Sequence, residues 1–247
     1  MLAFIILAAG KGTRMESDLP KVLHPLCGRP LVAWVLEAAQ LLKPQRTVVV
    51  VGHRAELVEE QVGRAFQVEF ALQSAMNGTG HAVQQAQPLL RDFKGDIIVT
   101  CGDAPLISSE TFLHLVKARR DADAAASMLV ATVENAGSYG RVIRDGERVL
   151  KIVEAKDASD QEKLCRDINA GTYCFKSEAL WRHLDRIGNA NNSGEYYLTD
   201  VVGLLGDAGE TVVSVGVTED EMVGVNTKAE LAALEVRVRQ SGACRDE

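Results

Sequence analysis

Short apolar runs alternate with longer amphipathic stretches through the first half of the chain. The apolar runs are Phe4–Leu7, Thr47–Val51, Val68–Leu72, Ile97–Val99 and Ala125–Val130. The stretches between and after them have helical periodicity: Pro30–Leu42, Ala55–Phe66, Gly80–Leu90 and Ser108–Arg120. Strands that alternate with helices form parallel sheets, and nearly continuous apolar strands are buried on both faces. The pattern therefore predicts an α/β fold, with a mostly parallel sheet and helices on both faces.

The alternation of predicted strands and helices ends at about Tyr139. The segment 141–154 predicts two strands around an Asp145-Gly146 turn, which is a hairpin rather than another strand–helix unit. A strand over 168–175, a capped helix over 177–184 and a last helix over 228–239 follow. No linker of distinct composition divides the chain, so we expect one domain with a later elaboration on the ligand side.

Composition limits the classes of function. The 247 residues carry 27 Lys+Arg and 34 Asp+Glu, a formal net charge of −7. This acidic balance argues against nucleic-acid binding, but a phosphate ligand needs only a few local cations and backbone amides. The apolar run 2–9 is too short to span a membrane. The five dispersed cysteines form no CxxC pair, which favours unpaired thiols in a reducing cytoplasm.

Ligands of open parallel sheets bind beyond the carboxyl ends of the strands, so the loops there are the candidates. The first loop, residues 7–21, reads LAAGKGTRMESDLPK. Its glycines permit a tight turn with amides facing a phosphate, and Lys11, Arg14 and Lys21 add positive charge. The loop lacks both the Walker pattern and a complete GxGxxG fingerprint. It predicts another kind of phosphate loop, with a plain surface turn as the alternative.

Two further loops carry candidate chemistry. Asp103 follows a strand and precedes Pro105, a position suited to Mg²⁺ beside a phosphate, although GD-x-P also forms ordinary turns. Gln73 offers a donor and an acceptor to a base edge, and Gly78 with Thr79 allows close backbone approach to a ring. A simple helix-opening turn is the alternative there.

These loops occur in one order with the motifs YGR, IVEAKD, INAG, GEYYLTD and GVN. In that combination, over about residues 3–240, the chain resembles the sugar-phosphate nucleotidyltransferases, and among them the uridylyltransferase half of bacterial bifunctional N-acetylglucosamine-1-phosphate enzymes. The resemblance implies a Rossmann-like nucleotide-diphospho-sugar transferase fold with a hairpin elaboration for the sugar. It implies a single domain over 1–247: a nucleotide part (about 1–133), a sugar part (about 134–226) and a C-terminal helix (about 227–240).

The resemblance also implies roles, motif by motif. Arg14 and Lys21 would be catalytic by holding the triphosphate, and Asp103 with Asn226 would bind Mg²⁺. The implied nucleotide-binding residues are Leu7, Ala8, Ala9, Gly10, Lys21, Gln73, Gly78, Thr79, Cys101, Gly102 and Asp103. The implied sugar-binding residues are Gly140, Glu154, Asn169, Tyr197 and Thr199. A carboxylate that accepts from hydroxyls and an amide that both donates and accepts suit an N-acetyl sugar.

The implied reaction transfers a uridylyl group from UTP to N-acetylglucosamine 1-phosphate, giving UDP-N-acetylglucosamine and pyrophosphate for peptidoglycan and lipopolysaccharide precursors. It would be cytoplasmic and Mg²⁺-assisted, with direct in-line attack on the α-phosphate. One alternative keeps the chemistry with another sugar 1-phosphate, such as glucose 1-phosphate, or another nucleotide. The other is a non-catalytic nucleotide-sugar sensor, against which the presence of all four cationic and metal-holding residues argues.

The chain departs from the family pattern in two respects. Cys101 stands where many relatives have Tyr, so a ring contact there is not expected. No hexapeptide repeat of a left-handed β-helix occurs up to Glu247, so we expect no acetyltransferase domain in this sequence, and no oligomeric state is implied.

Overall fold

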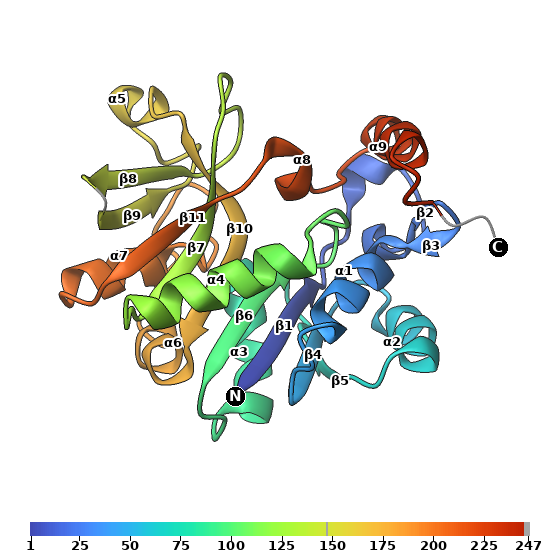
Figure 1. Cartoon of the computed structure of the whole chain (residues 1–247), viewed down its shortest axis with the longest axis horizontal. Coiled ribbons are helices and arrows are strands. Elements are labelled where there is room, and N and C mark those ends of the chain that lie inside the picture. Colours follow the sequence, from blue (N-terminus) through green and yellow to red (C-terminus); the bar gives the residue numbers. More distant parts are fainter. Residues whose placement is uncertain (147, 245–247) are drawn as a thin grey trace.

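The computed structural model describes residues 1–146 and 148–244, and within them the chain forms a nine-stranded sheet. The central path runs β11-β7-β10-β6-β1-β4-β5, and the β8–β9 hairpin attaches through β10 (Figure 1). The strands are β1 (Leu2–Ala8), β4 (Arg46–Val51), β5 (Glu69–Leu72), β6 (Asp96–Cys101), β7 (Ala126–Thr132), β8 (Arg141–Asp145), β9 (Arg148–Val153), β10 (Asp167–Lys176) and β11 (Val212–Gly216). A separate ribbon pairs β2 (Pro25–Leu26) with β3 (Arg29–Pro30).

The sheet confirms the predicted strand–helix alternation, and its central path contains one antiparallel strand. β1 pairs in parallel with β4 and β6, β4 with β5, and β7 with β11. β10 runs antiparallel between β6 and β7, with an irregularity between Asn169 and Tyr173. A strand from the second half of the chain is therefore inserted between two strands from the first half.

Helices cover both faces of this sheet, as the apolar strands predicted (Figure 1). Strand β1 shows the division, because Ile5 packs into the apolar cluster under α3, α6 and α7, whereas Phe4 and Ile6 pack under α1, α2 and α4. The helices are α1 (Leu31–Gln40), α2 (Ala55–Ala65), α3 (Thr79–Leu90), α4 (Ser109–Asp121), α5 (Asp160–Lys163), α6 (Ser177–Leu184), α7 (Asp200–Asp207), α8 (Glu219–Met222) and α9 (Lys228–Gln240). None of the helices in the described ranges combines the length and apolarity needed to cross a bilayer.

Two helix starts differ in how well the sequence predicted them. Ser108 caps α4 as expected, because its hydroxyl accepts from the Thr111 amide. The expectation that α6 is capped is wrong: its N-cap residue, Lys176, makes no capping hydrogen bond, and the hydroxyl of the first helical residue, Ser177, accepts from the Gly95 amide at 3.3 Å. That side chain therefore ties the start of α6 to the loop before β6.

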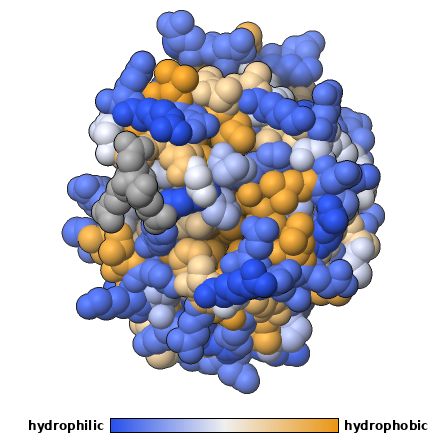
Figure 2. Space-filling model, turned by 90° about the vertical axis from the view of Figure 1, so that its right-hand side faces the viewer, coloured by the Kyte–Doolittle hydropathy of each residue, from blue (hydrophilic) through white to orange (hydrophobic). Residues whose placement is uncertain are grey.

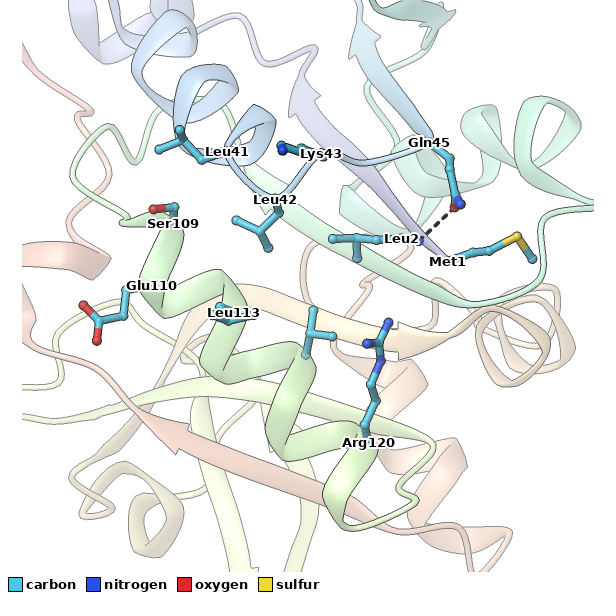
Figure 3. A pocket seen from close by; sticks show the side chains of 11 residues that line it. Met1, Leu2, Leu41, Leu42, Lys43, Gln45, Ser109, Glu110, Leu113 and Arg120 are labelled. Carbon is cyan, nitrogen blue, oxygen red and sulfur yellow. Dashed lines mark hydrogen bonds between the residues drawn. The ribbon is translucent and has the colours of Figure 1, made fainter.

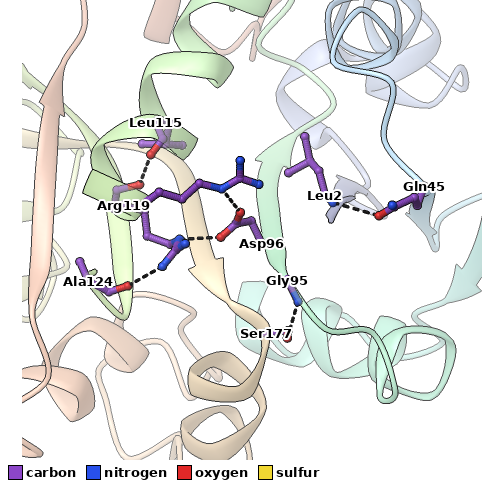
Figure 4. A network of polar contacts seen from close by, with 10 residues as sticks. Leu2, Gln45, Gly95, Asp96, Leu115, Arg119, Ala124 and Ser177 are labelled. Atoms are coloured by element: carbon purple, nitrogen blue, oxygen red, sulfur yellow. Dashed lines mark hydrogen bonds and ion pairs between the residues drawn. The ribbon is translucent and has the colours of Figure 1, made fainter. Parts of the chain in front are cut away.

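A buried ion-pair network fixes α4 to the amino end of β6 (Figure 4). Asp96 is 3% exposed, and its two carboxylate oxygens pair with Arg119 Nε at 2.5 Å and Arg120 Nε at 2.7 Å. Arg119 also donates to the carbonyl of Ala124 at 3.0 Å. Both carboxylate oxygens thus have cationic partners, which is what a buried charge requires.

The expectation that all five cysteines are unpaired is wrong for Cys27 and Cys244. They form a disulfide across 217 residues, whereas the other three cysteines, among the described residues, are free. The cause is the packing of α9, whose Leu234 and Val238 join Leu26 in one apolar cluster and bring the two thiols together. The side of the molecule that carries α9 shows separate hydrophobic patches among hydrophilic residues (Figure 2).

Candidate active site

A cavity of about 300 Å³ lies at the carboxyl ends of β1, β5 and β6. Its lining comes mainly from the three loops that the sequence singled out: Leu7, Ala8, Ala9, Gly10, Lys21, Val22, Gln73, Met76, Gly78, Thr79, Ala82, Cys101, Asp103 and Glu195. Every residue expected to bind the nucleotide lines it except Gly102. Gly102 lies just behind, where its amide donates to the Leu7 carbonyl at 2.9 Å.

The end of the cavity that the sequence predicts to bind the base is built around Gln73, which is 4% exposed. Its Nε2 donates to the Gly78 carbonyl at 3.0 Å and lies 3.1 Å from His81 Nδ1. Gly78 has φ 104°, and a Cβ there would lie 2.5 Å from the Tyr196 carbonyl oxygen. Only glycine fits this position. Thr79 Oγ1 accepts from the Leu198 amide at 3.0 Å, so the segment 196–198 braces the loop.

A cationic and oxygen-rich group lies at the other end. Lys21 forms an ion pair with Asp103, and each of the two side chains is 16% exposed. The Lys21 ammonium also donates to Asn226 Oδ1 at 3.1 Å, and Arg14 Nη2 donates to the same oxygen at 2.9 Å. The Val225 amide bonds the Asp103 carbonyl at 2.9 Å, which joins the two segments. The structure thus brings together all four residues expected at the phosphates and metal.

The oxygens of Asp103 and Asn226 fit a magnesium ion. Carboxylate and amide oxygens are hard ligands, and Mg²⁺ is commonly held by one or two carboxylates together with substrate phosphates. The Lys21 ammonium already contacts both side chains, so a cation suits this position. Within the described residues, no group of three or more His, Cys, Asp or Glu side chains is placed so that it could hold a metal ion.

The expected sugar-binding residues form a second cluster. The Asn169 amide donates to the Gly140 carbonyl at 2.9 Å, and Thr199 Oγ1 donates to Glu154 Oε1 at 3.0 Å. A Cβ on Gly140 would lie 3.5 Å from both Glu154 oxygens. Glu195 connects the two clusters, because it lines the cavity and its charge also acts on Glu154.

Burial determines the electrostatics of the second cluster. It is the main cause that raises the pKa of Glu154, with further contributions from Asp157, Asp200 and Glu195, while the Thr199 hydrogen bond opposes them. Burial likewise raises the pKa of Tyr197. An extra proton on the Glu154 carboxyl is therefore held more tightly than usual.

Cys101 lies in the cavity wall between Asp103 and Gly171. Burial raises the pKa of its thiol to about 12, and the nearby Asp103 charge adds to that effect. The thiol is therefore neutral at ordinary pH and a poor nucleophile, since the thiolate is the reactive form.

Sequence reasoning missed four residues of the cavity wall: Val22, Met76, Ala82 and Glu195. Glu195 stands inside the GEYYLTD motif and Met76 inside the loop after β5, so both carried a usable signal. Val22 and Ala82 are apolar and lie within predicted turns or helices, so nothing in the sequence marks them.

A larger cavity, of about 660 Å³, lies at the opposite, amino-terminal edge of the sheet (Figure 3). Leu2, Leu42 and Leu113 line it, and the Leu2 amide donates to Gln45 Oε1 at 3.2 Å. None of the predicted site residues lines it. Because ligands of such sheets bind at the carboxyl ends, we assign the site to the smaller cavity.

This fold and this site define a nucleotide-binding transferase class, and the chain belongs to the MobA-like NTP transferase domain family, whose model matches residues 4–216. The chain is 46% identical to bifunctional protein GlmU of Bacillus velezensis over 238 residues, which are 96% of this chain and 52% of that protein. It is 48% identical to GlmU of Geobacter metallireducens over 234 residues, 94% and 49% of the two chains. The chain spans about half the length of the curated relatives it matches.

Two solved structures share the fold. One, from Bacillus anthracis, is named as a glucose-1-phosphate thymidylyltransferase; it has a TM-score of 0.77 and 18% identity and covers 97% of this chain and 96% of its own. The other is a UDP-glucose pyrophosphorylase complexed with UDP-glucose, with a TM-score of 0.78, 15% identity and coverage of 97% and 98%. They confirm the predicted α/β nucleotidyltransferase fold.

Proposed function

We propose that this protein transfers the uridylyl group of UTP to N-acetylglucosamine 1-phosphate, forming UDP-N-acetylglucosamine and pyrophosphate. The observation that carries the proposal is the adjacency of three groups. The Gln73 cavity, the Lys21–Asp103–Asn226 group and the Glu154 cluster adjoin one another through Cys101 and Glu195. The similarity to bifunctional GlmU proteins supports the same reading.

The geometry of Gln73 favours uracil over cytosine. Its Nε2 is engaged by the Gly78 carbonyl and His81, which leaves Oε1 to accept a hydrogen bond. Uracil presents an imino N–H on its base-pairing edge, whereas the corresponding ring nitrogen of cytosine only accepts. A cytosine would leave this buried Gln73 oxygen without that donor, which is costly.

The second cluster favours an N-acetyl sugar. Asn169 Oδ1 accepts from the Gly171 amide at 3.1 Å, which leaves its Nδ2 to donate to an acetyl carbonyl. The Glu154 carboxylate would accept from sugar hydroxyls, with Thr199 holding it in place. Tyr197 and Gly140 would complete the contacts.

The chemistry proposed is one direct displacement. A phosphate oxygen of the sugar 1-phosphate attacks the α-phosphorus of UTP, a new O–P bond forms, and the bond to the bridging oxygen of pyrophosphate breaks. The attacker is already an anion, so no general base is needed. Arg14 and Lys21 would neutralise the triphosphate and the departing pyrophosphate. Asp103 and Asn226 would hold Mg²⁺, which supplies additional charge neutralisation at the phosphates when bound.

Pyrophosphate release, measured over the common nucleoside triphosphates against several sugar 1-phosphates, tests the proposal. We expect turnover only with UTP and N-acetylglucosamine 1-phosphate. Turnover with glucose 1-phosphate instead would assign glucose 1-phosphate as the sugar substrate. Binding of the nucleotide and sugar without turnover would identify the protein as a sensor. Because these nucleotides and sugar phosphates are cytoplasmic metabolites, we propose a cytoplasmic role in supplying peptidoglycan and lipopolysaccharide precursors.

A further inference from the structure

The proposed metal ligands are already in contact with a cation. The Lys21 ammonium forms an ion pair with the Asp103 carboxylate and donates to Asn226 Oδ1 at 3.1 Å. Arg14 donates to the same Asn226 oxygen at 2.9 Å. Both side chains that would hold a divalent ion therefore already have cationic partners.

A divalent ion and an ammonium cannot share these partners. Like charges at contact distance repel strongly where solvent screening is poor, and the side chains of Lys21 and Asp103 are each only 16% exposed. Lys21 must therefore move its charge before a metal can bind both oxygens. This movement breaks the ion pair with Asp103. The lost interaction is replaced only if the ammonium acquires another anionic partner.

The surroundings allow only the end of the Lys21 side chain to move. A Cβ on Gly12 would lie 2.6 Å from Lys21 Cβ, so the Gly12 backbone packs closely against the base of this side chain. The ammonium itself lies at the wall of the same cavity as Gly10, in the loop proposed to face the triphosphate. A phosphate held by that loop would give the ammonium its new partner without moving the backbone.

We propose that Lys21 occupies the divalent-metal position until a nucleoside triphosphate binds, and that its ammonium is what keeps a free divalent ion from Asp103 and Asn226. The proposal rests on the proposed function for the identity of the site. On binding, the Lys21–Asp103 ion pair is exchanged for a Lys21–phosphate pair and a metal–Asp103 bond. Lys21 thereby couples metal uptake to nucleotide uptake.

Binding of Mn²⁺, followed by the loss of its free-ion electron paramagnetic resonance signal, tests this without turnover. We expect the wild-type protein to bind free Mn²⁺ weakly, and Lys21→Met to bind it about tenfold more tightly, equivalent to about 1.4 kcal/mol. Lys11→Met is the matched control, because Lys11 is exposed in the same loop and has no ion pair within the described residues. Its affinity should stay within about twofold of the wild type, less than about 0.5 kcal/mol.

A second titration adds a non-hydrolysable UTP analogue. In the wild type we expect the analogue to bring Mn²⁺ onto the protein at concentrations where neither protein nor analogue alone retains it. Equal affinity of wild type and Lys21→Met for free Mn²⁺ would overturn the proposal, and so would an equal gain in Lys11→Met. Thermal unfolding checks that the variants fold, and Lys21→Gln replaces Lys21→Met if that variant does not.

The two proposals fail separately. The free-ion titration requires neither nucleotide nor catalysis, so an inactive protein can still show the effect of Lys21→Met. Conversely, a wild-type protein that is an active uridylyltransferase can still bind free Mn²⁺ as tightly as Lys21→Met does. That result would support the proposed function and exclude the proposal that Lys21 occupies the metal position.

Discussion

The hydroxyl of Thr199 donates to Oε1 of Glu154 at 3.0 Å, and Glu154 is the carboxylate of the second cluster whose pKa is raised by burial. The two effects oppose each other. Burial and the nearby carboxylates favour the protonated acid, whereas the hydrogen bond from Thr199 favours the carboxylate. Thr199 therefore lowers the pKa of Glu154 relative to burial alone and favours the carboxylate, the form that accepts hydrogen bonds from sugar hydroxyls.

We expect Thr199→Val to shift the pH dependence of the reaction. Without the donor, the pKa of Glu154 rises further, so the carboxylate is lost at a higher pH as the solution is acidified. The acidic limb of kcat/KM for the sugar phosphate should move to higher pH, and kcat/KM should fall by roughly two- to tenfold, as for loss of one hydrogen bond.

Thr132→Val is the control, because the Thr132 hydroxyl donates to Asp167 at an exposed position away from Glu154. Its pH profile should match that of the wild type. Glu154→Gln should remove the acidic limb altogether, since an amide does not titrate. If the acidic limb of the kcat/KM profile is unchanged in both Thr199→Val and Glu154→Gln, the proposal that the Glu154 carboxylate accepts from the sugar is contradicted.

The four side chains at the phosphate end should dominate catalysis. Asp103→Ala, Asn226→Ala and Lys21→Ala should each lower kcat by about 10²–10³, the usual loss when one group that stabilises transition-state charge is removed. Lys43→Ala, at an exposed lysine on the opposite edge of the sheet, should remain near the wild-type rate. Pyrophosphate release at saturating substrates is the measurement, and near-normal rates in all three variants would exclude the assignment.

Glu230 should act by positioning Asn226. Its Oε2 accepts from the Asn226 amide at 2.6 Å and from the Thr227 amide at 3.2 Å, in the capping box that begins α9. Glu230→Ala should raise the Mg²⁺ concentration for half-maximal rate by roughly fivefold, corresponding to about 1 kcal/mol for a lost cap, and leave kcat at saturating Mg²⁺ little changed. Glu235→Ala is the control, because it removes an ion pair with Arg239 on the same helix. It should change neither the Mg²⁺ concentration for half-maximal rate nor kcat.

The first half of the fold was predictable because its signals are local. The strands β1, β4, β5, β6 and β7 consist mainly of apolar residues, and the helices between them have their own periodicity. The loops after β1, β5 and β6 meet because parallel strands bring their carboxyl ends to one edge. That rule places Gly10, Gln73 and Asp103 near each other from sequence alone.

Contacts between distant segments carried no local signal. β10 lies antiparallel between β6 and β7, and strand order is decided by packing of the whole chain. Asn226 meets Lys21 across 205 residues, and only the resemblance to a known family suggested it. The expected cap of α6 does not form, and the Ser177 hydroxyl at its start accepts from the distant Gly95 amide, because tertiary partners compete with local capping.

The disulfide should stabilise the protein measurably. It joins residues 217 positions apart, so its reduction releases a long loop in the unfolded chain, and we expect a loss of about 2–4 kcal/mol in the free energy of unfolding. Urea unfolding with and without a thiol reductant is the measurement. The reductant should shift the wild-type midpoint but leave Cys244→Ser unchanged, and Cys165→Ser, which alters a free thiol, should respond as the wild type does. A wild-type midpoint insensitive to reductant would contradict a stabilising disulfide.

Asp96 should be among the most important single residues for stability outside the site. Asp96→Ala leaves Arg119, which is 9% exposed, without its carboxylate, and an uncompensated buried charge costs about 3–5 kcal/mol. Asp121→Ala is the matched control, because Asp121 pairs with Lys117 on the exposed surface of α4, the helix that carries Arg119. Its loss should lower the free energy of unfolding by less than about 0.5 kcal/mol. Urea unfolding monitored by circular dichroism compares the two variants. Equal losses of stability would mean that the Asp96 pair contributes no more than a solvated one, whereas the expected difference identifies the network as the anchor of α4 on β6.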